Sequence, residues 1–278
     1  MLVEALHYTR ARLGGESNAY GHLTELVGIW ARQRRQRPAW AGHLARARAL
    51  CLAAAESTFR ETRRTALVYG AGILNDIPLE RLSSLFRRVV LADMAFLPRT
   101  VHLAKALGNV ELMRTDLTGV LHAPPPSEFL AARAPAPMPD LRLGLKDVDF
   151  AYSANVLSQL PLAALATLGE RTPAPDPQHL KAYAASLVRA HLAALKILPC
   201  PACLVTDFQE QGLAGGQTHY DDNLLFGVDP ALPGETWTWR LAPRGEAHPE
   251  LDIERHVLGA PDVHAGPDHE IPHGDRNA

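Results

Sequence analysis

The amino-acid sequence predicts an α/β protein with a mostly parallel sheet, closed by an antiparallel hairpin and preceded by a helical cap. Apolar residues recur at helical spacing through the first 64 residues, and short β-branched runs then alternate with helical ones. Such alternation is typical of a parallel sheet with helices on both faces. The expected divisions are a helical cap at 1–64, a sheet domain at 65–260 and a flexible polar tail at 261–278.

The cap is predicted from two apolar series, one on each side of Pro38. Leu23, Leu26, Ile29 and Trp30 form the first series. Residues 1–64 carry eleven Arg and five Asp or Glu, a net charge of +6, and the remainder carries −8. A basic segment of this kind can face nucleic acid. The favoured interpretation is the solvated end of a helix, because no base-stacking pattern accompanies the charge. We expect the cap to lie partly over the carboxyl edge of the sheet.

The sheet domain is predicted from short apolar runs separated by turns and helices. The strand candidates are Thr65–Tyr69, Arg88–Ala92, Val110–Arg114, Val148–Ser153 and Ala202–Thr206, with a closing hairpin of Glu235–Leu241 and Leu251–Leu258. Helices are expected at about Pro78–Phe86, Pro98–Leu107 and Gln178–Leu198. Two Pro-rich stretches, Ala123–Pro139 and Arg171–Pro177, are expected to be surface loops.

Composition excludes several classes of protein. The 278 residues are 47% hydrophobic and 21% charged, which allows a sizeable core and excludes a wholly disordered chain. No apolar stretch approaches the roughly 18 residues of a membrane span, and the N-terminus lacks the pattern of a signal peptide. Three cysteines make no disulfide framework, so a cytoplasmic location is expected. Cys200 and Cys203 supply only two of four zinc ligands, so no metal site is expected.

A glycine turn carries the strongest chemical signal. The segment LVYGAGILND runs from a buried-type strand through Gly70-Ala71-Gly72 toward a helix. Alternate glycines allow a tight turn and close approach of backbone N–H groups to a ligand. The N-terminus of the following helix suits a carboxylate or phosphate. An ordinary strand-to-helix turn is the alternative interpretation.

Two acidic residues at strand ends point to an adenosine-type ligand. Asp93 directly follows the second strand, about twenty residues beyond the glycines, where a carboxylate can accept hydrogen bonds from both hydroxyls of a ribose. Asp116 follows the third strand, where it could meet an adenine. The alternatives are a helix N-cap for Asp93 and a loop-capping role for Asp116.

Four segments and the terminal hairpin carry a resemblance to a known family. The segments are VYGAGILND, VVLADM, ELMRTDLTG and DFAYSANVLSQLP. Through them, residues 60–260 resemble the class I S-adenosylmethionine-dependent methyltransferases. The resemblance implies a Rossmann-like, seven-stranded sheet with one reversed strand, and S-adenosylmethionine as cofactor. It places the methionine part along the glycines, the ribose at Asp93, the adenine at Asp116 and the transfer site at 153–155. The implied cofactor-binding residues are Tyr69, Gly70, Ala71, Gly72, Asp93, Met94, Asp116, Leu117, Ser153 and Asn155.

The preferred function is methyl transfer to an acceptor that the sequence leaves unidentified, with no catalytic residue assigned. A non-catalytic binding or assembly protein that retains the fold is the alternative, because Val68 and Leu74 depart from the family's glycine motif. An NAD-dependent oxidoreductase is disfavoured by the missing third glycine and the absence of a Tyr-x-x-x-Lys pattern.

Overall fold

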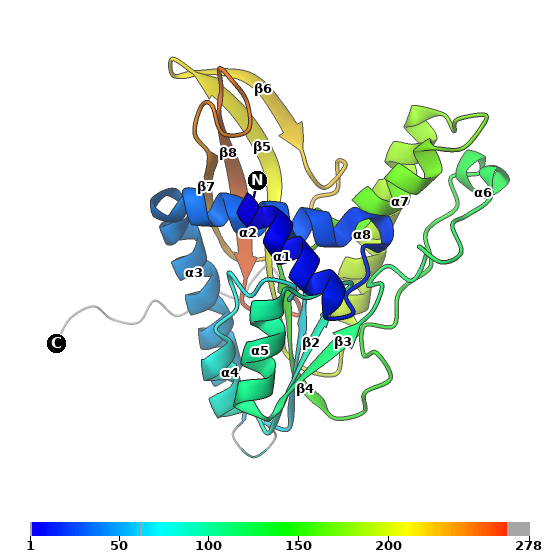
Figure 1. Cartoon of the computed structure of the whole chain (residues 1–278). Helices are drawn as coiled ribbons and strands as arrows, with labels where there is room; N and C mark the ends of the chain where they lie inside the picture. The colour runs from blue at the N-terminus through cyan, green and yellow to red at the C-terminus, as the bar shows by residue number, and fades with distance from the viewer. Residues whose placement is uncertain (1, 60, 62, 266–278) are drawn as a thin grey trace.

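The computed structural model describes residues 2–59, 61 and 63–265. Its centre is an eight-stranded sheet in the order β3-β2-β1-β4-β5-β8-β7, with β6 paired to β5 outside this path (Figure 1). The strands are β1 (Thr65–Tyr69), β2 (Arg88–Asp93), β3 (Val110–Arg114), β4 (Val148–Ala154), β5 (Ala202–Ala214), β6 (Gln217–Asn223), β7 (Glu235–Ala242) and β8 (Asp252–Ala260). β1 to β5 pair in parallel, and β8 runs antiparallel to both β5 and β7. The predicted parallel sheet and closing hairpin are thereby confirmed.

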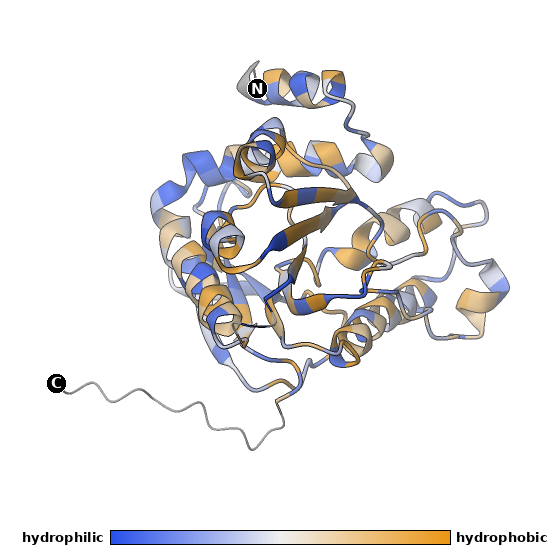
Figure 2. Ribbon diagram, turned by 90° about the horizontal axis from the view of Figure 1, so that it is seen from below, coloured by the Kyte–Doolittle hydropathy of each residue, from blue (hydrophilic) through white to orange (hydrophobic). Residues whose placement is uncertain are grey.

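Helices cover both faces of the sheet. They are α1 (Leu2–Leu13), α2 (His22–Arg35), α3 (Arg37–Glu56), α4 (Leu79–Leu85), α5 (Pro98–Leu107), α6 (Ser127–Ala131), α7 (Leu160–Gly169) and α8 (Pro177–Lys196), with a short 3-10 turn η1 (Ala19–Gly21). One core cluster joins α3 and α4 to one face, and a second joins α8 to the other. In Figure 2 the central strands are predominantly hydrophobic, and the surrounding helices carry both hydrophobic and hydrophilic residues. No helix in the described residues is long and apolar enough to cross a bilayer.

An aromatic cluster joins the cap to the closing hairpin. Trp237 and Trp239 lie two residues apart on β7 and are both buried against α3. Trp40 meets Trp239 edge-on with ring centroids 4.7 Å apart, and His43 stacks on Trp239 at 4.1 Å. The Trp237 indole donates to Nδ1 of His43 at 3.2 Å. The strand's alternation therefore orients its tryptophans toward a helix, as their spacing indicates.

The N-terminal helices cover one end of the sheet. α1 packs on α2 and α5, and a small core cluster joins Leu23 and Val27 of α2 to Ala95 and Leu97, which follow β2. Figure 1 shows α1 and α2 crossing above the strands, at the end where β1 to β4 lead into their following loops. The last cap helix, α3, ends at Glu56, so it does not extend to residue 64, where the sequence predicts the helical cap to end. Most of the expected flexible tail, residues 266–278, lies outside the described residues.

Several elements differ from the sequence-based expectation. β5 extends to Ala214 and pairs with β6 through its second half, whereas the apolar run predicted a strand ending at Thr206. Residues 207–214 lack a continuous apolar run, because four of the eight have polar side chains, and backbone pairing on both edges sustains the strand there. α6 lies inside a stretch expected to be loop, and α7 was not predicted. α6 has only five residues, and α7 is anchored by packing on α8.

Candidate functional site

The glycine turn after β1 is tightly enclosed by the protein itself. Gly70 has a φ of 78°, and a Cβ there would lie 2.7 Å from the carbonyl oxygen of Ala154 at the end of β4. A Cβ on Gly72 would lie 2.7 Å from Cδ2 of Leu26, which α2 brings onto the turn. Gly70 is required for its left-handed conformation, and Gly72 for the close approach of the cap. Ala71 between them is fully buried.

Asp93 at the end of β2 binds this turn. Its Oδ2 accepts a hydrogen bond from the Gly72 N–H at 2.8 Å, and its Oδ1 accepts from the Met94 N–H at 2.7 Å. Burial raises the pKa of Asp93 to about 6, against the opposing effect of these backbone donors. Leu97 occupies the N-cap position of α5, so Asp93 does not cap that helix. The Asp93 carboxylate thus lies beside the glycines, where the sequence predicts a residue that binds a ribose.

Asp116 after β3 organises a loop and borders a cavity. It accepts from the N–H and hydroxyl of Thr118 at 2.8 and 2.6 Å, and from the N–H of Leu121 at 2.9 Å. A cavity of about 410 Å³ opens beside it, with both apolar and polar lining. Its lining residues are Met113, Arg114, Thr115, Asp116, Leu117, Gly119, Pro139, Asp140 and Leu143. The two residues expected to flank an adenine, Asp116 and Leu117, therefore face available space.

The other predicted site residues have internal partners. The Tyr69 hydroxyl donates to the carbonyl of Leu141 at 2.5 Å. Ser153 is buried, with its Oγ 3.2 Å from Nε2 of His191. Met94 packs at the edge of the core cluster between α7 and α8. The Tyr69 and Ser153 side chains therefore have hydrogen-bond partners inside the protein, and Met94 contributes to the core.

Asn155 follows β4 in a left-handed conformation with a φ of 49°. Its Oδ1 accepts from the N–H of Asp207 at 2.9 Å, and its own N–H donates to the carbonyl of Val205 at 2.8 Å. Asparagine tolerates this conformation better than most residues. Asn155 therefore ties the end of β4 to β5 at the expected transfer site.

A buried charged network on β5 and β8 escaped the sequence analysis. Asp207 is fully buried and accepts hydrogen bonds from the hydroxyl of Ser158 and from Arg255. Arg255 also pairs with Glu210 at 2.8 Å. The sequence does contain one indication of this network: Asp207 directly follows the apolar run of the fifth strand, as Asp93 follows that of the second. Its partner lies 48 residues away, which no local pattern indicates.

A second buried acid links the cap to the sheet edge. Glu16, which is 3% exposed, accepts from the Phe96 N–H at 3.1 Å and from Nε of Arg114 at 3.1 Å. The hydroxyl of Tyr20 donates to the carbonyl of Leu121 at 2.8 Å. The segment between α1 and α2 is therefore bound to the residues after β2 and β3, where the predicted ligand site lies.

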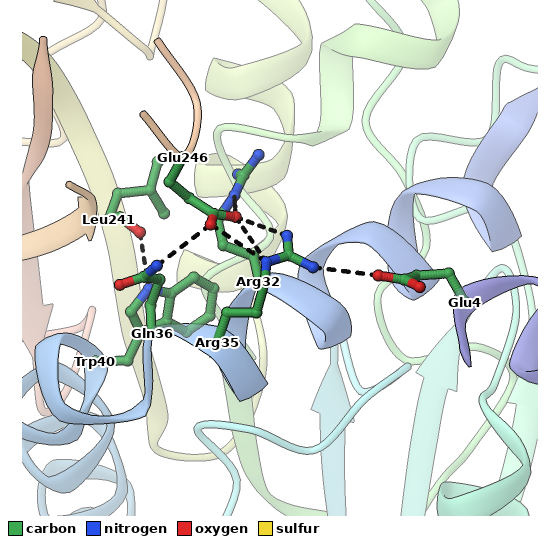
Figure 3. Close-up of polar contacts among 7 residues, drawn as sticks. All are labelled: Glu4, Arg32, Arg35, Gln36, Trp40, Leu241 and Glu246. Atoms are coloured by element: carbon green, nitrogen blue, oxygen red, sulfur yellow. Dashed lines mark hydrogen bonds and ion pairs between the residues drawn. The ribbon is translucent and has the colours of Figure 1, made fainter. Parts of the chain in front are cut away.

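Two of the basic residues near Pro38, Arg32 and Arg35, have acidic partners within the chain. Figure 3 shows Arg32, Arg35 and Gln36 converging on Glu246 from the loop between β7 and β8. Arg35 donates to Glu246 at 2.6 Å and also pairs with Glu4 at 3.2 Å. Hydrogen bonding from Arg35 lowers the pKa of Glu246. This cluster ties the hairpin to the cap, which accounts for part of the basic charge without nucleic acid.

An adenosine-type ligand fits this edge in part. Space is present beside Asp116, whereas Asp93 and the glycine turn that it binds are not among the residues that line this cavity. Leu26 covers Gly72, so a ligand reaching from the cavity across the turn requires α2 to move. In the described part of the chain, His, Cys, Asp and Glu do not gather in groups of three that could hold a metal.

No protein-family model and no curated protein sequence matches the chain. Among solved structures, one similar chain is 1,6-didemethyltoxoflavin-N1-methyltransferase of Burkholderia thailandensis with S-adenosylhomocysteine bound. It is 14% identical to this chain with a TM-score of 0.33, and the match covers 85% of this chain and 89% of that one. The N-methyltransferase NodS from Bradyrhizobium japonicum WM9, also with S-adenosylhomocysteine, is 14% identical with a TM-score of 0.35, covering 81% and 89%. The 23S rRNA methyltransferase ErmE is 14% identical with a TM-score of 0.28, covering 76% and 67%.

The sheet itself has the features that the sequence resemblance implies. Seven strands lie along one path, six of them run in the same direction, and the reversed strand β8 lies between β5 and β7. The chain has the class I methyltransferase-like fold.

Proposed function

We propose that the protein binds S-adenosylmethionine along the carboxyl ends of β3, β2 and β1 and transfers its methyl group to an acceptor. The observation that carries this proposal is the cavity at the end of β3, bordered by Asp116 and Leu117, with Asp93 on the next strand. Ligands of open α/β sheets bind at this edge, where the strand order reverses between β1 and β4.

Each residue would have a defined task. Leu117 would give the base an apolar wall. Asp93 already accepts hydrogen bonds from the backbone N–H groups of Gly72, Met94 and Ala95, and would accept a further one from the ribose. The bound cofactor would supply a methyl group on a sulfonium. The transfer is an in-line displacement, so orientation can provide most of the acceleration. A general base is needed only if the acceptor must lose a proton.

Thermal unfolding of the full chain with separate ligands tests this function. S-adenosylhomocysteine at about 100 times its Kd should stabilise the native state by about 2.7 kcal/mol and raise the Tm. NAD, offered at the same concentration, should have no comparable effect. A shift with NAD alone would favour the oxidoreductase instead. An unchanged Tm at millimolar S-adenosylhomocysteine would contradict the proposal.

A binding or assembly protein is the second candidate, favoured by the packing of Leu26 on Gly72. In that case the cap is a permanent part of the core, and the edge takes no cofactor. Substituting Leu26 with alanine separates the two functions. If the wild type and this variant both fail to bind S-adenosylhomocysteine, the non-catalytic function is supported.

A further inference from the structure

The outer face of α1 exposes two large apolar side chains to solvent. Leu6 is 48% exposed and Leu13 is 84% exposed. Arg10, also exposed, lies four residues after Leu6 and three before Leu13, so the three side chains follow one stripe of the helix. The helix packs on α2 and α5 through its other side, where Ala11 is buried. Figure 2 shows this N-terminal helix at the periphery of the molecule.

Positive charge gathers beside this stripe. The guanidinium carbon of Arg34 on α2 lies 5.0 Å from the centroid of the Trp30 ring, and the imidazole of His7 on α1 lies 3.9 Å from the same ring. Burial lowers the pKa of His7, and the positive charges of Arg10 and Arg34 lower it further. Both arginines therefore lie close to one imidazole, and the stripe on α1 is continuous with the end of α2.

These two arginines differ from their neighbour in having no acidic partner. Arg35, the next residue along α2, pairs with Glu4 and with Glu246. Within residues 2–59, 61 and 63–265, no ion pair joins Arg10 or Arg34 to a carboxylate. Uncompensated like charges on a surface create a positive potential, which attracts an anionic partner.

The combination of this charge with exposed leucines favours one kind of partner. Helices that lie along a membrane interface place arginines against anionic head groups and leucines at the acyl boundary. A nucleic acid would use the charge but not the leucines, and the Trp30 ring, which could stack on a base, is only 8% exposed. Two-fold pairing with a second copy would bring this surface against itself and juxtapose its uncompensated arginines.

We propose that the outer face of α1, formed by Leu6, Arg10 and Leu13 together with the adjoining Arg34, docks the protein on an anionic lipid surface. Two cations and two leucines make such docking weak and reversible. The surface uses none of the residues proposed to bind S-adenosylmethionine, so this inference and the proposed function stand or fall separately.

Co-sedimentation of the full chain with vesicles tests the docking. One set of vesicles is phosphatidylcholine alone, and the other contains about one-third phosphatidylglycerol, which gives it a negative surface potential. The protein should sediment with the anionic vesicles and not with the neutral ones. Binding should weaken in about 0.5 M salt, because screening shortens the range of the attraction.

Substitutions on the surface locate the contact. Arg10→Gln and Arg34→Gln should each lower the partition coefficient on anionic vesicles about fivefold, and the double variant about 25-fold. Leu13→Ser should lower it about 5- to 10-fold through lost apolar contact. The three side chains are exposed, so the variants should fold with nearly unchanged Tm. Arg189→Gln on α8 and Leu162→Ser on α7 are matched exposed controls and should bind as the wild type does.

Each outcome decides the proposal. Losses that follow both the arginines and Leu13 support it. Anionic-vesicle binding that these substitutions leave unchanged, or no binding by the folded wild type, overturns it. A lipid-free dimer in sedimentation velocity that Leu13→Ser dissociates also overturns it, because the surface then binds a second copy. So does a labelled oligouridine that binds more tightly than the vesicles and depends on the arginines but not on Leu13.

Discussion

The Asp93 carboxylate accepts a hydrogen bond from the Gly72 N–H at 2.8 Å, so the end of β2 holds the turn that follows β1. The N–H groups of a glycine turn are the groups expected to approach a ligand. Here one of them is already bound by the residue expected to hold the ribose. Asp93 therefore has a structural role as well as its proposed ligand contact.

The first prediction follows from this double role. Asp93→Ala should lower the free energy of unfolding by about 1–3 kcal/mol, because the Gly72 and Met94 N–H groups lose their acceptor. It should also raise the Kd for S-adenosylhomocysteine by about 10- to 150-fold. Urea unfolding and calorimetry measure the two effects. Asp93→Asn, which keeps one acceptor oxygen, should be intermediate in both, and a stable variant with unchanged affinity would refute the ribose assignment.

A second prediction concerns the cover on the glycine turn. Leu26→Ala should tighten S-adenosylhomocysteine binding, because the ligand no longer has to displace this side chain from Gly72. Stability should fall by up to about 2–3 kcal/mol, since Leu26 is only partly buried. Val27→Ala is the control: it removes core contacts on the same helix without uncovering the turn. Weaker binding in Leu26→Ala alone would mean that Leu26 contacts the ligand.

The third prediction tests the link between the cap and the sheet edge. Glu16→Gln should increase hydrogen exchange in α1 and α2, because the buried carboxylate no longer pairs with Arg114. The expected loss of stability is about 1–3 kcal/mol, moderated because the Arg114 side chain is 44% exposed and can be hydrated. The exposed Glu25→Gln on α2 should change neither quantity. Exchange that increases equally throughout the protein would indicate global destabilisation instead.

The fourth prediction concerns acid sensitivity. Burial lowers the pKa of His191 to about 3, whereas an unfolded His titrates near 6.5. As pH falls below 6.5 the unfolded chain gains a proton that the native state does not bind, so this residue destabilises the fold progressively down to about pH 3. Between pH 7 and pH 5 the loss attributable to His191 is about 2 kcal/mol.

His191→Gln should lack that part of the loss, since its amide does not titrate and can still face Ser153. Urea unfolding at pH 7 and pH 5 checks this difference between variant and wild type. The exposed-residue control is His102→Gln on α5, which should follow the wild-type profile. An identical pH dependence for His191→Gln would show that His191 is protonated in the native state.

The sequence by itself determined the strands whose apolar runs are short and bounded, from β1 to β4, and the closing hairpin. It also placed Asp93 and Asp116 at strand ends, because a parallel sheet brings those ends to one edge. Local pattern was sufficient for these features, since each depends on alternation, turn residues or the position of one acid after an apolar run.

Only the tertiary structure decided how that edge is covered and charged. Leu26 reaches Gly72, Glu16 reaches Arg114, and Asp207 reaches Arg255 across long separations in the chain. The outer half of β5 is likewise sustained by pairing with β6 and β8 rather than by its own polar residues. These features arise when distant segments pack and bury their polar groups, and hydrogen bonding between such segments leaves no periodicity in the sequence of either one.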